Sequence, residues 1–225
     1  DNYLRMIDGL VYGDDPRQGF VEANTFYHPE LKFRYPVPSG WTLQNSPLQV
    51  QMAPADGKAV IIFTLAQQKN LDEAAQQTLS SLNLNVLDNK KVTVNGFPAL
   101  ATLSQQVSQN AQTGTQQTLK VMSYFIQFNE NIFVFHGVAS DADFNTYYRM
   151  FESTMVNFNR LTDSSKLNVK PKRIKIQQVR RTGTLAETLK SFSVPESQLK
   201  ELALLNNLEL TDQVQPGKMI KTIGQ

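Results

Sequence analysis

The pattern of hydrophobic and polar positions is most distinctive over residues 119–140. Two runs rich in β-branched and aromatic residues flank the polar tripeptide Asn129-Glu130-Asn131, which is typical of an antiparallel hairpin with a short turn. Both runs carry apolar side chains at successive positions, so that Phe125 and Ile126 point to opposite faces. The sequence therefore predicts a central hairpin that is covered on both sides.

The remaining periodicities predict an α+β domain over residues 26–161. An amphipathic helix begins after Asn70, with Glu73 three residues on, and a second helix with an aromatic face is expected to be capped by Ser140 or Asp141. The order of strands, helix, strands and helix is typical of an α+β domain with a mainly antiparallel sheet. Residues 104–118 have hardly any apolar side chain and predict a long mobile excursion. Strands are expected at 31–35, 48–52, 59–65, 91–94 and 97–103.

A small β-α-α-β unit is predicted over residues 172–225, after a polar linker at 162–171. Thr184-x-x-Glu187 is a capping box that opens the first helix, and Pro195 opens the second. The flanking strands are expected at residues 174–179 and 219–223. Such a unit is close to the lower size limit for independent folding.

Residues 1–25 are interpreted as the end of a preceding domain and its linker. Residues 3–11 have apolar positions at helical spacing, and a polar connection is expected from Gly13 through Thr25. Since the chain opens at Asp1 without Met or an apolar leader, we expect it to be part of a longer protein. The exposed apolar side chains of residues 3–11 should then pack on that preceding domain or on a second copy of the chain.

Composition excludes several classes of function. The 225 residues are 40% hydrophobic and 19% charged, with a net charge of +2 and no cysteine, so disulfides and thiolate metal sites are excluded. No apolar run reaches the roughly 20 residues of a membrane span. A basic stretch from Lys166 to Arg181 has no interleaved stacking aromatic, which argues against nucleic acid. We interpret it as a solvated face, with attraction to an anionic envelope surface as the alternative.

The sequence contains no motif for catalysis. It has neither an HExxH, a GxSxG nor a phosphate-binding loop, and its two histidines, His28 and His136, lie in unrelated contexts that indicate structural roles. The acidic pairs Asp14-Asp15 and Asp141/Asp143 fit a turn and a first helical turn. We therefore expect no catalytic residue, no metal ligand and no cofactor in this chain.

Three stretches resemble part of a known family. Residues 7–20, then Phe26-x-His28-Pro29, then Pro38-x-Gly40-Trp41 resemble the region after the catalytic domain in bacterial envelope zinc metallopeptidases related to the Ste family, peptidase family M forty-eight. This resemblance covers the non-catalytic C-terminal part and implies a zinc site in a preceding catalytic domain. The arrangement of the middle domain resembles the PsbP/Mog1-like α/β/α sandwich.

The C-terminal unit resembles a LysM module, through Gly183-Thr184-Leu185, Leu205-Asn206-Asn207-Leu208 and Pro216-Gly217-x-x-Ile220. In such modules N-acetylglucosamine-containing glycans bind between the first loop and the loop before the last strand. The usual Gly-Asp before Thr-Leu is Thr182-Gly183 here, which leaves a module kept only for its fold as the alternative. The resemblance implies a glycan site formed by Gly183, Thr184, Leu185, Asn206, Asn207, Gln215, Pro216 and Gly217.

Two classes of function follow from these resemblances. The first is a non-catalytic accessory region of a periplasmic or envelope zinc metallopeptidase, with the protease's own catalytic domain and peptidoglycan or another envelope glycan as expected partners. The alternative is a stand-alone glycan-binding or structural envelope protein without peptidase activity. Binding of glycan by the C-terminal unit separates a binding role from a purely structural one.

Overall fold

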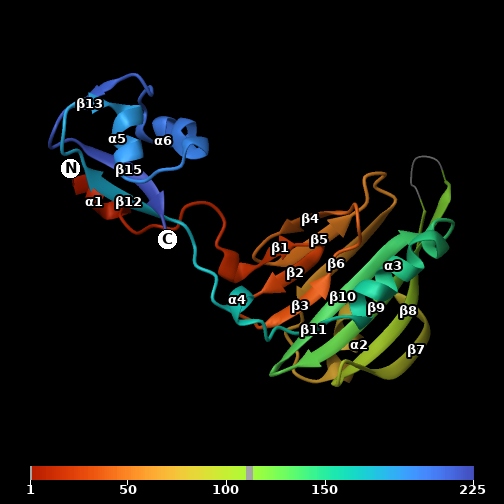
Figure 1. The fold of residues 1–225 in the computed structure, drawn as a ribbon. Helices are drawn as coiled ribbons and strands as arrows, with labels where there is room; N and C mark the ends of the chain where they lie inside the picture. The colour runs from red at the N-terminus through yellow and green to blue at the C-terminus, as the bar shows by residue number, and fades with distance from the viewer. Residues whose placement is uncertain (1, 110–113) are drawn as a thin grey trace. The chain divides into compact units, whose positions relative to one another are not determined.

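The computed structural model describes residues 2–109 and 114–225, which form two compact units. The large unit is Gly19–Leu167, and the small unit combines the segment that ends at Gln18 with Asn168–Gln225. Figure 1 shows the red N-terminal segment and the blue C-terminal segment in the same unit. In sequence, the large unit is therefore an insertion between two segments of the small one.

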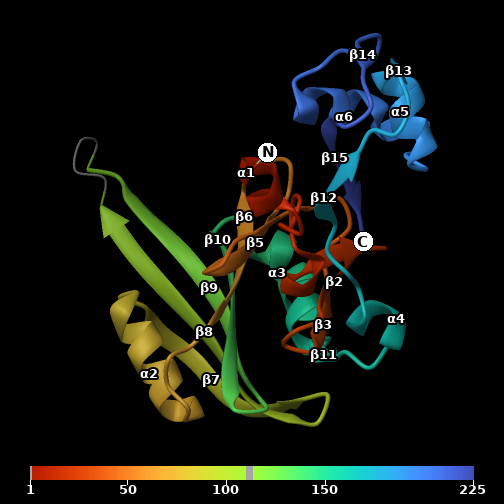
Figure 2. The same ribbon diagram turned by 90° about the vertical axis from the view of Figure 1, so that its left-hand side faces the viewer.

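The large unit contains two antiparallel sheets (Figures 1 and 2). The seven-stranded sheet has the order β4-β5-β6-β10-β9-β8-β7, and the four-stranded sheet has the order β1-β2-β3-β11. The strands are β1 (Phe20–Glu22), β2 (Thr25–His28), β3 (Phe33–Pro36), β4 (Thr42–Asn45), β5 (Gln49–Ala53), β6 (Ala59–Leu65), β7 (Asn85–Val94), β8 (Phe97–Gln109), β9 (Gln116–Phe128), β10 (Asn131–Ser140) and β11 (Asn159–Arg160).

The predicted central hairpin is confirmed. β9 and β10 pair from Phe128↔Asn131 to Leu119↔Ser140, and β10 is the middle strand of the seven. The two faces separate as expected from the alternation. Phe125 packs with α2 (Leu71–Ser81), whereas Ile126 packs with α3 (Phe144–Val156) and the four-stranded sheet.

The helices cover opposite faces of the seven-stranded sheet, as Figure 2 shows. α2 begins where the sequence predicts, because the Asn70 side chain accepts hydrogen bonds from the backbone N–H groups of Asp72 and Glu73. The predicted cap of α3 is wrong: the helix begins after Asp143, and the Ser140 hydroxyl instead binds Asp143. The chain is thus a mixed α and β protein with antiparallel sheets.

Two expectations about loops in the large unit are wrong. The connection expected through Thr25 contains β1, which pairs with β2 across a turn in which Ala23 and Asn24 have φ of 47° and 55°. The excursion expected at 104–118 extends β8 to Gln109 and begins β9 at Gln116. Residues 110–113 lie outside the described part. Within this extension Ser104 is buried and residues 107–109 are exposed, and the pairing of the two strands satisfies the backbone N–H and C=O groups.

The small unit follows the predicted order of strand, helix, helix and strand. Its two outer strands pair antiparallel, from Arg173↔Gly224 to Gln178↔Met219, and the Thr184–Glu187 capping box is present. Short helices flank these elements: α1 in the N-terminal segment and α4 in the predicted linker. The elements are α1 (Asn2–Ile7), η1 (Pro16–Gln18), α4 (Ser164–Leu167, large unit), β12 (Arg173–Gln178), β13 (Gly183–Thr184), α5 (Leu185–Ser191), η2 (Glu196–Gln198), α6 (Leu199–Asn206), β14 (Gln213–Val214) and β15 (Met219–Gly224).

The N-terminal segment extends the β12-β15 sheet of the same chain. Backbone hydrogen bonds join Gly9 N–H to the Ile174 carbonyl, Ile174 N–H to the Leu10 carbonyl and Tyr12 N–H to the Lys172 carbonyl, at 2.7–2.9 Å. Association of a second copy through residues 3–11 remains a prediction, since the side chains of Tyr3 and Met6 stay exposed.

Candidate functional site

Two loops of the small unit come together to form the candidate site. Residues 179–184 follow β12, and residues 207–218 lead from α6 to β15. β13 pairs with β14 through Gly183↔Val214, and the Leu185 N–H donates to the Asp212 carbonyl at 2.8 Å. The Gly217 N–H donates to the Val179 carbonyl at 2.9 Å. These backbone bonds hold both loops as one surface.

Residues 183–185, which the sequence assigns to the first loop, have different environments. The Thr184 hydroxyl caps α5 by accepting from the Glu187 N–H, and Glu187 in turn accepts from the Thr184 N–H. Leu185 is fully buried in the core of the small unit, so its side chain contributes to folding. Of these three residues, Gly183 and Thr184 are partly exposed to solvent.

The predicted residues of the second loop also divide into two groups. Gln215, Pro216 and Gly217 are exposed, and the Gln215 side chain accepts from the Thr182 hydroxyl at 2.8 Å. Thr182 therefore supplies a hydrogen bond between the loops. Asn207 is also exposed, in the left-handed conformation that ends α6.

Asn206 is committed to the fold. Its amide nitrogen donates to the carbonyls of Leu202 and Lys221, both at 2.8 Å, and its amide oxygen accepts from the Lys221 N–H at 2.7 Å. The side chain thus pairs with the free edge of β15 as a neighbouring strand would. Both N–H donors of its side-chain amide are occupied. Asn206 therefore links α6 to β15 by hydrogen bonds.

Replacing Asn206 with alanine should destabilise the small unit by about 1–3 kcal/mol, because the partly buried N–H and carbonyl of Lys221 lose their partners. Native-state hydrogen exchange of the β15 and α6 amides measures this unit separately from the large one. Gln215→Ala is the matched control, since it removes one hydrogen bond from an exposed side chain. Equal hydrogen-exchange protection in the two variants would contradict the role of Asn206 in linking α6 to β15.

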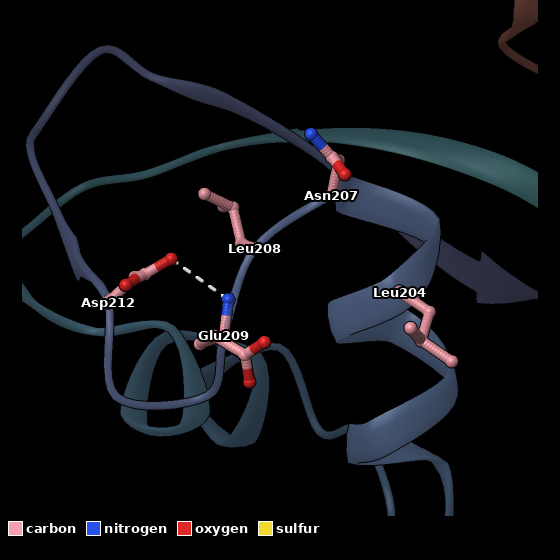
Figure 3. Close-up of a pocket in the computed structure, with 5 residues that line it drawn as sticks. All are labelled: Leu204, Asn207, Leu208, Glu209 and Asp212. Carbon is pink, nitrogen blue, oxygen red and sulfur yellow. Dashed lines mark hydrogen bonds between the residues drawn. The ribbon is translucent and has the colours of Figure 1, made fainter.

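A depression lies beside the joined loops, at the end of α6 (Figure 3). It has a volume of about 180 Å³ and combines the apolar side chains of Leu204 and Leu208 with the polar side chains of Asn207, Glu209 and Asp212. The Asp212 carboxylate accepts from the Glu209 N–H at 2.9 Å, which holds the turn in place. Leu204 is 82% exposed, an unusual position for a large apolar side chain.

Of the eight site residues that the resemblance implies, Asn207 lines this depression. Leu204 lies on α6, where helical periodicity makes it the residue that faces away from the buried Leu202 and Ala203. That outward position was the one available signal. Residues 208–212 form a turn whose shape depends on the Asp212 bond, which the sequence pattern does not reveal.

The two histidines lie in different parts of the large unit. His28 is partly buried in β2, and its Nδ1 accepts from the Leu31 N–H at 3.2 Å. His136 is buried in β10, and its Nδ1 lies 2.7 Å from the Ser123 hydroxyl. Burial lowers the pKa of both, that of His136 to about 4. Among residues 2–109 and 114–225, no three His, Asp or Glu side chains lie together where they could hold a metal.

A row of polar side chains crosses the middle of the seven-stranded sheet. The sequence pattern did not predict that these residues lie together. The register places Thr102, Ser123 and His136 side by side on β8, β9 and β10. All three are at most 5% exposed, and the Thr102 hydroxyl has no hydrogen-bond partner in the described part of the protein. A substrate could not reach the Ser123–His136 pair without opening the sheet, so we assign this row to the fold.

The basic side chains of 166–181 are distributed over both units. The Lys166 ammonium pairs with Glu22 and lies over the Tyr27 ring. The Arg173 guanidinium donates to the Gly9 carbonyl at 2.6 Å, and the Lys175 ammonium to the Gln225 carbonyl at 2.5 Å. Several of these basic side chains therefore form ion pairs or hydrogen bonds with other residues of the chain. None of the helices within the described residues is long and apolar enough to span a membrane.

Comparisons with known proteins give similarities of fold. No protein-family model and no curated protein sequence matches the chain. Among solved structures, it is similar to cyanobacterial PsbP (CyanoP) from Synechocystis sp. PCC 6803, with 9% identity, a TM-score of 0.45, and coverage of 60% of this chain and 91% of that one. It is also similar to the Ran-binding protein Mog1p of Saccharomyces cerevisiae, with 17% identity, a TM-score of 0.44, and coverage of 60% and 93%.

A third similar structure is a protein from Bacteroides thetaiotaomicron, with 10% identity and a TM-score of 0.44, in which 83% of this chain covers 59% of that one. At these identities the similarity concerns the fold alone. The arrangement of elements that the sequence predicts for the middle domain resembles that of the same two proteins, PsbP and Mog1. The LysM-like unit and the metallopeptidase parent stay predictions.

Proposed function

We propose that this chain is a non-catalytic accessory region of a periplasmic or secreted zinc metallopeptidase, and that its small unit positions the protease by binding an envelope glycan. The observation that supports this best is the joining of residues 179–184 and 207–218 into one surface beside a depression. A LysM-type site is expected between these two loops. The zinc would belong to the HExxH motif of a preceding catalytic domain, which would also be a partner of this chain.

The chemistry of the depression suits a sugar ring. Leu204 presents an exposed apolar side chain that can pack against the C–H face of a sugar. The Asn207 amide can both donate to and accept from hydroxyl and acetamido groups, and the Glu209 carboxylate can accept from hydroxyls. Gln215 and Gly217 lie further along the same loop and are also exposed.

Titration of the full chain with chitin and peptidoglycan oligomers, followed by amide chemical shifts, tests this function. A single open site buries few contacts, so we expect a dissociation constant between about micromolar and millimolar, or about −8 to −4 kcal/mol. The shifts should be confined to residues 179–185 and 204–217. Absence of shifts at millimolar oligomer would overturn the glycan function.

A matched pair of variants tests the role of the depression. Leu204→Ser should weaken binding about tenfold, because the apolar contact with the sugar is lost. Leu48→Ser removes an equally exposed leucine, 85% against 82%, from the β4-β5 turn in the large unit and should leave binding unchanged. Equal affinity of the two variants would exclude the depression as the site.

The second candidate is a stand-alone glycan-binding or structural envelope protein without a peptidase parent. The engagement of Leu185 and Asn206 within the fold favours a structural role for part of the LysM-like pattern. Determination of the sequence that precedes Asp1 in the natural protein separates the two candidates. An HExxH motif there supports the accessory function, and its absence supports the alternative.

A further inference from the structure

The free edge of the seven-stranded sheet is formed by one long strand. β7 has ten residues, pairs on one side with β8 and has no strand on its other side within the described residues (Figure 2). The side chains of residues 85–91 are all exposed. Unpaired N–H and C=O groups on such an edge are a template for another strand.

Pro98 shows which backbone groups of β7 face outward. It lies opposite Thr93 and has no N–H, so Thr93–Pro98 is a pair without mutual hydrogen bonds, and the Thr93 backbone points to the free edge. Alternation then turns the backbone of Lys91 and Asn89 outward as well. The Asn89 N–H agrees with this orientation, since it donates to the Asp88 carboxylate at 2.8 Å instead of to β8.

Charges of opposite sign flank Asn89 on this edge. Asp88 and Lys90 are two residues apart, so their exposed side chains lie on the same face of β7. Neither forms an ion pair within the described residues, whereas Lys91 pairs with Asp72 of α2 at 3.0 Å. The edge is therefore self-complementary about Asn89.

We propose that two copies of this chain associate through their β7 strands, antiparallel, with Asn89 on the two-fold axis. Asn89 then pairs with Asn89 of the second copy by two backbone hydrogen bonds, and Asp88 of each copy faces Lys90 of the other. Directly opposed side chains of opposite charge stabilise antiparallel pairs. The Asn89 N–H passes from the Asp88 carboxylate to a carbonyl of the other copy, which leaves Asp88 free to bind Lys90.

Other registers of the same strand place like charges together. A two-fold axis at Asp88 opposes two carboxylates, and an axis at Lys90 or Lys91 opposes two ammonium groups. An axis between two residues would bring outward-facing backbone groups against inward-facing ones, so that no hydrogen bonds form. Among the registers centred on residues 88–91, Asn89 is therefore the one that both the backbone and the charges permit.

Sedimentation of the full chain from micromolar to millimolar concentration tests the proposal, together with charge reversals. The wild-type chain should show a concentration-dependent dimer. Asp88→Lys and Lys90→Asp should each raise the dimer dissociation constant at least about tenfold, because each creates two like-charge pairs. The double reversal should restore association, as should a mixture of the two single variants, since both arrangements recover the Asp–Lys pairs.

Lys200→Asp, at an exposed position of α6, controls for the change in net charge and should leave association unchanged. Far-ultraviolet circular dichroism and Trp41 fluorescence establish that each variant is folded. A wild-type chain that stays monomeric at millimolar concentration overturns the proposal. So does a dimer that is insensitive to the single reversals, or one that the double reversal does not restore.

Discussion

Replacement of Phe158 with alanine should destabilise the large unit by about 3–5 kcal/mol, the range for truncation of a buried aromatic side chain. Phe158 is fully buried directly after α3, with ring-centroid distances of 5.3 Å to Phe33 and 5.6 Å to both Phe128 and Phe133. Its ring therefore contacts the four-stranded sheet and the seven-stranded sheet together. The cavity left by alanine would lie where these two layers meet.

Urea unfolding monitored by Trp41 fluorescence measures this loss. Trp41, the single tryptophan of the chain, lies in the large unit, with its ring edge-to-face on Tyr147 and Phe151 at 5.9 and 6.3 Å. Tyr148→Ala is the control, because Tyr148 is 37% exposed on α3, the helix that precedes Phe158. A loss for Phe158→Ala no greater than that for Tyr148→Ala would contradict the central position of the ring.

Acidification from pH 6.5 to 4 should remove about 3 kcal/mol of stability from the large unit through His136, since each pKa unit corresponds to about 1.4 kcal/mol. Burial lowers the pKa of His136 from 6.5 to about 4 in the folded protein. Between these values the unfolded chain binds more protons than the folded one, so stability falls as pH falls. Above pH 6.5 the contribution is fully present, and below pH 4 it is lost.

His136→Asn should flatten the pH dependence in this window, because asparagine does not titrate. Burial also lowers the pKa of His28, which adds a change of the same sign, so His28→Gln is measured alongside. Ser123→Ala removes the hydrogen-bond partner of His136 and keeps its titration. A slope between pH 6.5 and 4 that is the same in His136→Asn and wild type would refute the assignment to His136.

Local signals in the sequence predicted several elements correctly. The Asn70 cap of α2 and the Thr184–Glu187 capping box both lie where the sequence predicts them, and β7 and β8 meet at the short turn between the strands expected at 91–94 and 97–103. Each depends on residues at most three apart, so their geometry is set by the chain itself. The alternation around Phe125 likewise predicted the two covered faces of the hairpin.

The sequence predicted the candidate site only in part, because the environments of its residues depend on distant segments of the chain. The sequence indicated both loops, and the structure joins them, but the side chains of Leu185 and Asn206 turn inward to the fold. Their environment depends on β15, which follows Asn206 by more than ten residues. The depression around Leu204 likewise depends on the turn that Asp212 closes.

The sequence alone determined the elements whose signals are local: the central hairpin, the capped helices and the strand-helix-helix-strand order of the small unit. Only the tertiary structure decided which distant segments pair. Polar residues 104–109 form a strand because residues 116–121 lie opposite them, and β1 forms because β2 satisfies its backbone. The same holds for residues 9–12, which bind Lys172 and β12 at positions 160 or more residues away. Such pairing is stabilised by backbone groups that every residue carries, so the side-chain pattern does not encode it.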